Sequence, residues 1–156
     1  HDPAVPDSLA GDGVTALARD AAGAIWVATS AGGLQRIRPG ETRFASALDA
    51  AQLPGLNSTR NIAPRSNGHL LIATRLGTYE LDADGATAFA NYRLTAGKVI
   101  ITHTETPPAL RGRGIASQLI QGALEQIRAD RSKVVAGCSF VVDYLDKHPE
   151  FGDVST

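Results

Sequence analysis

The chain has few of the features that mark several large classes of protein. Its 156 residues include one cysteine, Cys138, which excludes an internal disulfide and indicates a reducing compartment or indifference to redox conditions. No apolar run approaches the roughly 18 residues of a membrane span. The N-terminus also lacks the basic and apolar regions of a secretion signal. We therefore expect a cytoplasmic protein without a membrane partner.

Charge and metal-binding patterns are sparse as well. The formal net charge is −1 with no long run of either sign, which argues against a nucleic-acid partner. His1, His69, His103 and His148 are scattered and do not pair at ligand spacing, so no metal is expected. What is present is a chain with 43% apolar residues, enough for a packed core in one ordinary domain or two small ones.

The first half of the chain contains an internal repeat. Gly23 and Gly68 lie 45 residues apart, and Thr29 and Thr74 keep the same offset. In each copy, turn residues separate short apolar runs, which is typical of hairpins. Several short strands within a period of roughly 40–45 residues are typical of propeller blades.

The run Ala24-Ile25-Trp26-Val27-Ala28-Thr29 resembles the repeats of two-component-regulator-type β-propellers, whereas the second copy has Leu71 in place of the tryptophan. The resemblance implies one to two blade-like repeats of a sensor region. Closing a propeller takes at least about four blades, so a sensing function is not favoured. A structural sheet or a passenger segment remains the alternative. Unpaired edge strands in this half favour a homodimer formed by strand addition.

The two halves meet between Thr74 and Gly85, a segment that fits either the end of a blade or the first hairpin of the second half. We place the boundary between a propeller-like segment, 1–77, and a second domain, 78–156. A natural fusion and an engineered chimera both remain open. Residues 44–57 are expected to form an exposed loop between the two copies.

The second half changes to a pattern of mixed strands and helices, so the whole chain is predicted to be α+β. A helix over 115–129 has apolar residues at spacings of three and four, which gives one buried stripe. The strand after it should lie parallel to the strand before it. The expected strands are 78–82, 87–94, 98–103 and 133–136, and a last helix runs from Phe140 to Lys147 with Ser139 as its N-cap.

The segment between the third of these strands and the first helix is the most informative part of the sequence. A proline-stiffened loop leads into a glycine-rich turn that opens directly into the helix, so free backbone N–H groups and a positive helix end face an anion. Arg111 and Arg113 add charge for a phosphate. Gly112 and Gly114 allow the backbone to approach it closely. An ordinary strand–loop–helix turn is the structural alternative.

The spacing Arg111-x-x-Gly114-x-Ala116 resembles the pyrophosphate loop of the GNAT acetyltransferase superfamily. From Tyr79 to Val154 the chain resembles the small YjdJ-like branch of that superfamily. The matching motifs are Asp84-Gly85 before Ala88-x-Ala90-x-Tyr92; His103-Thr104-Glu105-x-Pro107-Pro108-x-Leu110-Arg111-Gly112-x-Gly114; Lys133-Val134; Cys138-x-Phe140-Val141; Tyr144; and His148-Pro149-Glu150. The chain departs at Asp130-Arg131-Ser132, where the family's turn usually contains glycine.

This resemblance implies a small α/β domain that uses acetyl-CoA as co-substrate and transfers the acetyl group directly to an amine acceptor. The cofactor-binding residues would be Arg111, Gly112, Arg113, Gly114, Ile115, Ala116 and His148. A non-catalytic binding fragment, or a chimera that retains only the fold, is the competing interpretation.

Four residues are candidates for the chemistry of transfer. Glu105 and His103 lie two residues apart on the same strand, and either one fits the base that deprotonates the amine. Tyr144 lies where the superfamily usually has its general acid. Cys138, just before a helix, is a candidate nucleophile. Each also has a structural interpretation. His103 would be a half-buried, hydrogen-bonded residue and Glu105 a hydrogen-bond acceptor that orients the loop. Tyr144 would pack on the apolar face of its helix, and Cys138 would be a buried structural cysteine.

Overall fold

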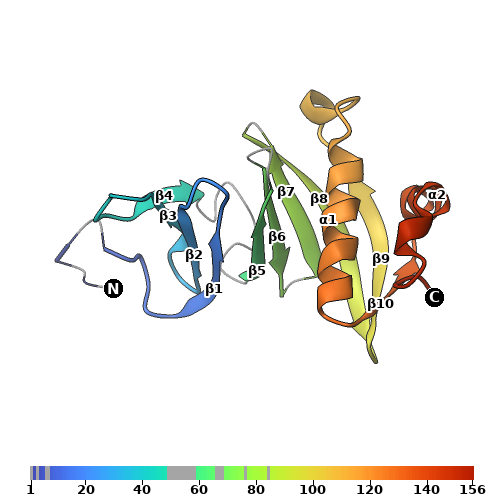
Figure 1. Cartoon of the computed structure of the whole chain (residues 1–156), viewed down its shortest axis with the longest axis horizontal. Coiled ribbons are helices and arrows are strands. Elements are labelled where there is room, and N and C mark those ends of the chain that lie inside the picture. Colours follow the sequence, from blue (N-terminus) through green and yellow to red (C-terminus); the bar gives the residue numbers. More distant parts are fainter. Residues whose placement is uncertain are drawn as a thin grey trace. The chain divides into compact units, whose positions relative to one another are not determined.

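The computed structural model describes residues 2, 4–5, 8–48, 59–65, 69–75, 77–83 and 85–156, and these divide into two compact units, His1–Leu76 and Gly77–Thr156 (Figure 1). The turn at Gly68, Asp84 and residues 49–57 of the predicted loop lie outside the described residues. None of the helices in these ranges is long and apolar enough to cross a membrane.

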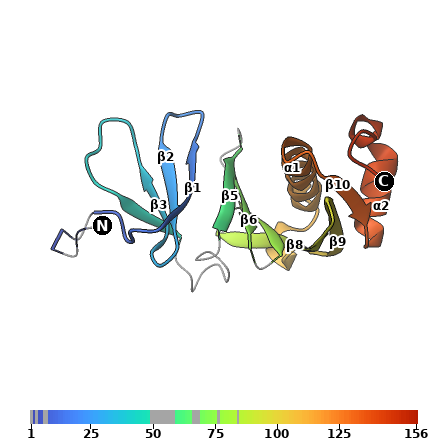
Figure 2. The ribbon, with the colours of Figure 1, turned by 90° about the horizontal axis from the view of Figure 1, so that it is seen from below.

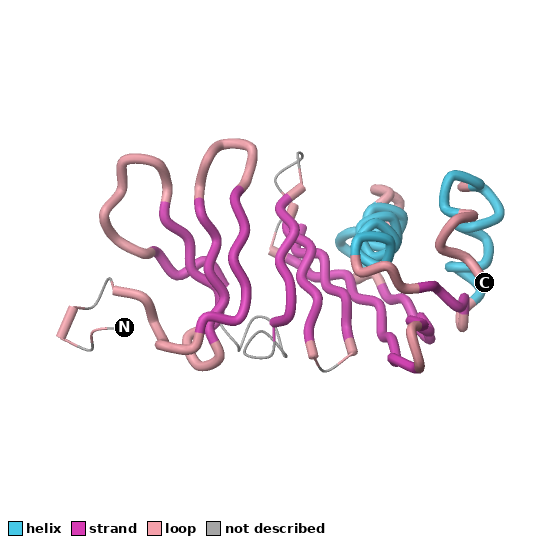
Figure 3. Tube along the Cα trace, turned by 60° about the horizontal axis from the view of Figure 1, so that its bottom comes forward, coloured by secondary structure: helices cyan, strands magenta, loops and turns pink. Residues whose placement is uncertain are grey.

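The first unit is built from antiparallel strands. Its strands are β1 (Val14–Arg19), β2 (Ile25–Thr29), β3 (Gly33–Ile37), β4 (Ala45–Leu48), β5 (Thr59–Pro64) and β6 (Leu70–Thr74). The first four form a sheet in the order β1-β2-β3-β4, and β5 pairs with β6. Figure 3 colours the strands of the chain magenta and its helices cyan, and the helices lie toward the C-terminus. The predicted antiparallel sheet is therefore confirmed. Its identity as a propeller blade stays a prediction.

Equivalent strands of the two sequence copies contribute to one apolar core. This core consists of Ala28, Leu34, Ile62, Leu70 and Ile72. Beside it, the indole N–H of Trp26 donates to the Asp20 carboxylate at 2.9 Å, and the Arg36 guanidinium lies 5.0 Å from the centre of the indole. These contacts account for the tryptophan and the turn aspartate of the first copy.

The expectation of a loop over 44–57 is wrong for its first residues, because β4 forms at Ala45–Leu48. Ala45 and Ser46 pair with Arg36 and Gln35 on β3. The backbone edge of β3 offers unpaired N–H and C=O groups, and pairing satisfies them. The sequence of β4 lacks the alternation that marks a strand, so its pairing depends on the neighbouring edge.

The second unit has a mixed α/β architecture. Its elements are β7 (Thr78–Ala83), β8 (Ala86–Thr95), β9 (Lys98–Glu105), α1 (Ile115–Ala129), β10 (Lys133–Ala136) and α2 (Ser139–Lys147), with short 3₁₀ turns at Pro108–Leu110 and Pro149–Phe151. The strand order is β10-β9-β8-β7, with β10 parallel to β9 and the other pairs antiparallel (Figures 1 and 2).

Helix α1 lies against this sheet through the predicted apolar stripe. Leu119, Ile120, Ala123, Leu124 and Ile127 are fully buried. Alternate residues of the strands, including Leu81, Ala88 and Ile101, are also fully buried, as one face of a covered sheet should be. The predicted helix 115–129 and the parallel strand 133–136 are confirmed.

The start of α2 differs from the prediction. Cys138 is the N-cap, with an extended backbone at φ −133° and ψ 152°, and Ser139 is the first helical residue. No side chain accepts a hydrogen bond as a cap there. The rule that serine precedes a helix therefore placed the boundary one residue too late.

Helix α1 ends in a left-handed turn without glycine. The N–H groups of Arg131 and Ser132 donate to the carbonyls of Arg128 and Ile127, each at 3.0 Å, which is the hydrogen-bond pattern of a Schellman motif. Arg131 has φ 54°, and it is the non-glycine residue with positive φ within the described ranges. A side chain in this conformation costs stability.

We expect Arg131→Gly to stabilise the protein by about 0.5–1 kcal/mol, because glycine lacks the steric penalty of the left-handed region. Urea unfolding measures the change. Arg131→Ala is the matched control, since it removes the same charge but keeps Cβ. Equal stabilisation by alanine and glycine would contradict this explanation.

Glu80 on β7 is 5% exposed, and only one of its carboxylate oxygens is hydrogen-bonded within the described structure: Oε1 accepts from the Thr78 hydroxyl at 3.1 Å. Burial raises the pKa of Glu80 to about 7. The folded state therefore holds this proton over a pH range in which the unfolded chain has lost it.

The free energy of unfolding should therefore fall as pH rises from about 4.5 to about 7, by up to about 3 kcal/mol from this residue. Below that window the contribution is fully retained. In Glu80→Gln, urea unfolding across this pH range should lose the corresponding slope. An unchanged slope would show that Glu80 is not its source.

Candidate functional site

Strand β10 pairs with only the first half of β9. Lys133 to Ala136 pair with Lys98 to Ile101, and the Gly137 N–H then donates to the Ile101 carbonyl at 2.8 Å. A Cβ on Gly137 would lie 2.7 Å from that carbonyl oxygen, so this position requires glycine. Beyond Ile101 the remainder of β9 has no pairing with β10. A gap therefore opens between the two strands at this end of the sheet.

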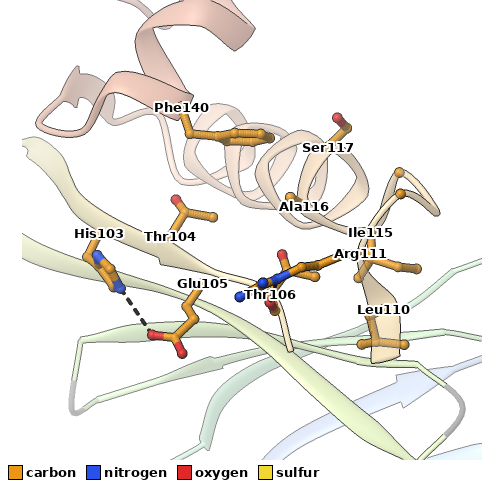
Figure 4. A pocket seen from close by; sticks show the side chains of 12 residues that line it. His103, Thr104, Glu105, Thr106, Leu110, Arg111, Ile115, Ala116, Ser117 and Phe140 are labelled. Carbon is orange, nitrogen blue, oxygen red and sulfur yellow. Dashed lines mark hydrogen bonds and ion pairs between the residues drawn. The ribbon is translucent and has the colours of Figure 1, made fainter. Parts of the chain in front are cut away.

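A pocket of about 500 Å³ lies at this opening (Figure 4). It is formed by the end of β9, the loop that follows, the first turn of α1 and the start of α2. Its lining residues are His103, Thr104, Glu105, Thr106, Leu110, Arg111, Gly112, Gly114, Ile115, Ala116, Ser117 and Phe140.

A β-bulge in β9 sets the direction of the side chains in the pocket. Asn91 of β8 pairs with His103, whereas the next residue, Tyr92, pairs with Ile101, so Thr102 is the extra residue. Beyond the bulge, Thr104 points toward α1 and Phe140, and His103 and Glu105 point to the other side of β9 (Figure 4).

His103 and Glu105 contact each other at the rim of the pocket. The distance from His103 Nε2 to Glu105 Oε2 is 3.3 Å, and both side chains are slightly more than half exposed, at 55% and 56%. A carboxylate that accepts from one imidazole nitrogen favours the tautomer with the other nitrogen free to accept a proton. The pair is therefore arranged to accept a proton from a molecule that enters this side of the pocket.

The glycine turn leaves space for a ligand. Gly112 and Gly114 have φ of 73° and 72°, and a Cβ built on either meets nothing within 4 Å. The glycines are thus needed for backbone conformation, and the space beside them is open to the pocket. Arg111 is exposed, and its Nε donates to the Thr106 carbonyl at 3.2 Å, which fixes the side chain across the loop.

The N-terminus of α1 adds positive potential to the same space. Gly114 is the N-cap and has no side chain to accept from the first-turn amides, and that turn contains no acidic residue. The first N–H groups of any α-helix have no carbonyl partner within the helix. Together with Arg111, these groups fit a diphosphate, since anions bind at helix N-termini through backbone amides and the helix dipole.

Tyr144 and His148 line a second, smaller pocket of about 140 Å³, which shares Ser117 and Phe140 with the first. The two rings stack, with centroids 4.0 Å apart. Burial, with lesser contributions from the Glu150 and Glu125 carboxylates, raises the pKa of Tyr144 above its usual value. The phenol therefore keeps its proton at neutral pH. His148 Nδ1 lies 2.8 Å from Glu150 Oε1.

Most of the predicted site residues line one of the two pockets, and two of them line neither. The larger pocket is lined by His103, Glu105, Arg111, Gly112, Gly114, Ile115 and Ala116. Cys138 and Arg113 are outside the lining of both pockets. Cys138 Sγ is 3.5 Å from the hydroxyl of Thr104, which does line the larger one.

The sequence analysis did not name the other lining residues as site residues, among them Thr104, Thr106, Ser117 and Phe140. Thr104 and Phe140 do fall within the matching motifs, whereas Thr106 and Ser117 are marked only by their proximity in sequence to the glycine turn. Within the described part of the chain, no three His, Cys, Asp or Glu side chains gather in an arrangement that suits a metal ion.

Comparisons with known proteins bear on each unit. Residues 78–154 match the family model of the GCN5-related N-acetyltransferases, and residues 8–31 match that of the two-component regulator propeller. The proteins named NATD1 from chicken and mouse are 37% identical to this chain over 51 residues, which is 33% of this chain and 46% of each relative. The match thus spans less than half the length of these curated relatives.

An NMR structure of a GCN5-like protein from Staphylococcus aureus is 26% identical, with a TM-score of 0.39; the alignment covers 61% of this chain and 86% of that one. The family match covers every element of the second unit from β7 to the C-terminal turn, including the whole lining of the larger pocket. Residues 78–154, just under half of the chain, are therefore similar to the GCN5-related N-acetyltransferase (GNAT) family along the whole of the second unit.

Proposed function

We propose that the protein is an acetyl-CoA-dependent N-acetyltransferase that transfers the acetyl group directly to an amine. The observation that carries this proposal is the open glycine turn at the uncapped start of α1, beside the gap between β9 and β10. The turn offers backbone amides and an arginine, and the gap offers an open pocket next to an imidazole–carboxylate pair. A CoA thioester needs an anion-binding turn for its diphosphate and open space for the part of the molecule that carries the acetyl group.

In this proposal, the diphosphate of acetyl-CoA binds to the backbone amides of residues 112–116, with Arg111 and Arg113 nearby. Gly112 and Gly114 support it because their Cα atoms face open space. His148 would contact the co-substrate from the smaller pocket. Thr104 and Phe140, on the α1 side of β9, would contact the part of the molecule that lies in the gap (Figure 4).

The reaction needs an acceptor and a donor of protons. Acetyl-CoA supplies the acetyl group as a thioester, so the amine nitrogen bonds to the carbonyl carbon while the carbon–sulfur bond breaks. The incoming ammonium must first lose a proton, and in this proposal the His103–Glu105 pair accepts it, which the 3.3 Å contact between the two side chains supports. Tyr144, which remains protonated at neutral pH, would supply a proton to the leaving thiolate. A covalent route with Cys138 as nucleophile is less favoured than direct transfer, because the sulfur contacts the Thr104 hydroxyl and Cys138 does not line the pocket.

We further propose that the domain belongs to the YjdJ-like branch and that the first unit is a propeller-type blade segment. The order of the motifs from Asp84 to Glu150 supports the first statement. The match of residues 8–31 and the β1-β2-β3-β4 sheet support the second. The alternative function, a binding fragment without catalysis, is favoured only by that N-terminal match. Saturable binding of acetyl-CoA would separate the two.

We expect Gly114→Leu to abolish binding of acetyl-CoA in a calorimetric titration, because the side chain would occupy the open space at the turn. Gly97→Leu is the matched control. Gly97 has φ 76° and also meets nothing within 4 Å, so the substitution causes the same backbone strain in the β8–β9 turn, away from the pocket. Loss of binding in both variants would show that strain, and not the site, is responsible.

Replacing the base should lower kcat by about 100-fold without changing the Kd for acetyl-CoA. Glu105→Gln and His103→Gln, compared by steady-state kinetics across pH, identify which residue acts. The acidic limb of the pH–rate profile reports protonation of the base, so it should disappear in the variant whose substituted residue is the base. The other variant should keep this limb. The assignment fails if both variants retain the kcat and the pH profile of the parent protein.

A further inference from the structure

We infer that Phe89 is a specificity-determining residue for the acceptor, and that the acceptor binds as an alkylammonium ion on the sheet face opposite α1, against Phe89, His103 and Glu105. This inference rests on the proposed function. It adds the side from which the acceptor enters and the residue that selects its charge.

Strand register places these three side chains on one face. Phe89 on β8 lies directly opposite Glu105 on β9, and Asn91 lies opposite His103. Residues directly opposite in an antiparallel pair project to the same side. The centroids of the Phe89 and His103 rings are 6.1 Å apart, and His103 contacts Glu105 at 3.3 Å. The three side chains therefore form one continuous surface at the rim of the larger pocket.

The composition of this surface suits a cation. An aromatic face attracts an ammonium group, and a carboxylate beside it forms a charge-assisted hydrogen bond. On the other side of Phe89, β7 places Glu80 directly opposite in register. Glu80 is 5% exposed, and its Oε2 has no hydrogen-bond partner within the described structure. Phe89 is thus flanked by a carboxyl group on each neighbouring strand.

The bulge at Thr102 separates this surface from the proposed co-substrate site. Thr104 points to the α1 side, while His103 and Glu105 point to the opposite side (Figure 4). Acetyl-CoA and the acceptor would then reach the gap from opposite faces of β9. An alkylamine is protonated at neutral pH, so it is bound as the cation and loses its proton to the His103–Glu105 pair. A neutral aromatic amine gains none of these cation contacts.

The experiment measures release of CoA by the full chain with three acceptors: n-butylamine, the lysine side chain of Nα-acetyl-lysine amide, and aniline. Binding of acetyl-CoA is measured first by calorimetry, so failure of the donor site is distinguished from failure of this inference. We expect kcat/KM for both alkylamines to exceed that for aniline at least tenfold. The ratio between the two alkylamines then tells a free small amine from a lysine side chain.

Phe89→Leu keeps the apolar bulk but removes the aromatic face, so the KM for n-butylamine should rise about fivefold to tenfold while the KM for acetyl-CoA stays the same. Phe140→Leu is the matched control on the α1 side, and its effect should fall on the KM for acetyl-CoA. Circular dichroism checks that both variants fold.

A second measurement uses the unmodified protein, in case Phe89→Leu fails to fold. Tetramethylammonium should inhibit competitively against n-butylamine, and tert-butanol, a neutral molecule of similar shape, should not inhibit. The inference is overturned if acetyl-CoA binds but aniline is acetylated as fast as n-butylamine. Equal inhibition by tetramethylammonium and tert-butanol would overturn it as well.

Discussion

The site depends on the point at which β10 leaves β9. Parallel pairing ends at Ile101, and Gly137 is the residue that allows the chain to turn away within 2.8 Å of the Ile101 carbonyl. The unpaired half of β9, the glycine turn and the start of α1 then surround one opening. If β10 continued along β9, its backbone would fill this opening. The pocket is therefore a consequence of unequal strand length more than of any single side chain.

The bulge at Thr102 gives the two sides of β9 different chemistry. Without it, strict alternation would place His103 and Glu105 on the same side as Ile101, against the apolar core. With it, the imidazole and the carboxylate are more than half exposed, and Thr104 turns toward α1. One extra residue thus separates a side suited to an anionic co-substrate from a side suited to a cation.

The elements that were predicted correctly are those whose signals are local. The three-and-four spacing of apolar residues defines α1, and the glycines before it define the turn, because each depends on residues close in sequence. The bulge could not be predicted, since it depends on how β8 and β9 pair. For the same reason β4 was missed: its strand depends on the free edge of β3. The N-cap of α2 was misplaced by one residue because Ser139 satisfied a general rule that the local backbone does not follow.

The most direct test of the account is an NMR titration of the ¹⁵N-labelled full chain with acetyl-CoA. We expect the largest amide shift changes on Gly112 to Ser117 and on the unpaired half of β9, with none of similar size in residues 14–48. Large changes confined to the first unit, or no changes in a folded protein, would show that the uncapped start of α1 and the gap beside it do not bind the CoA thioester.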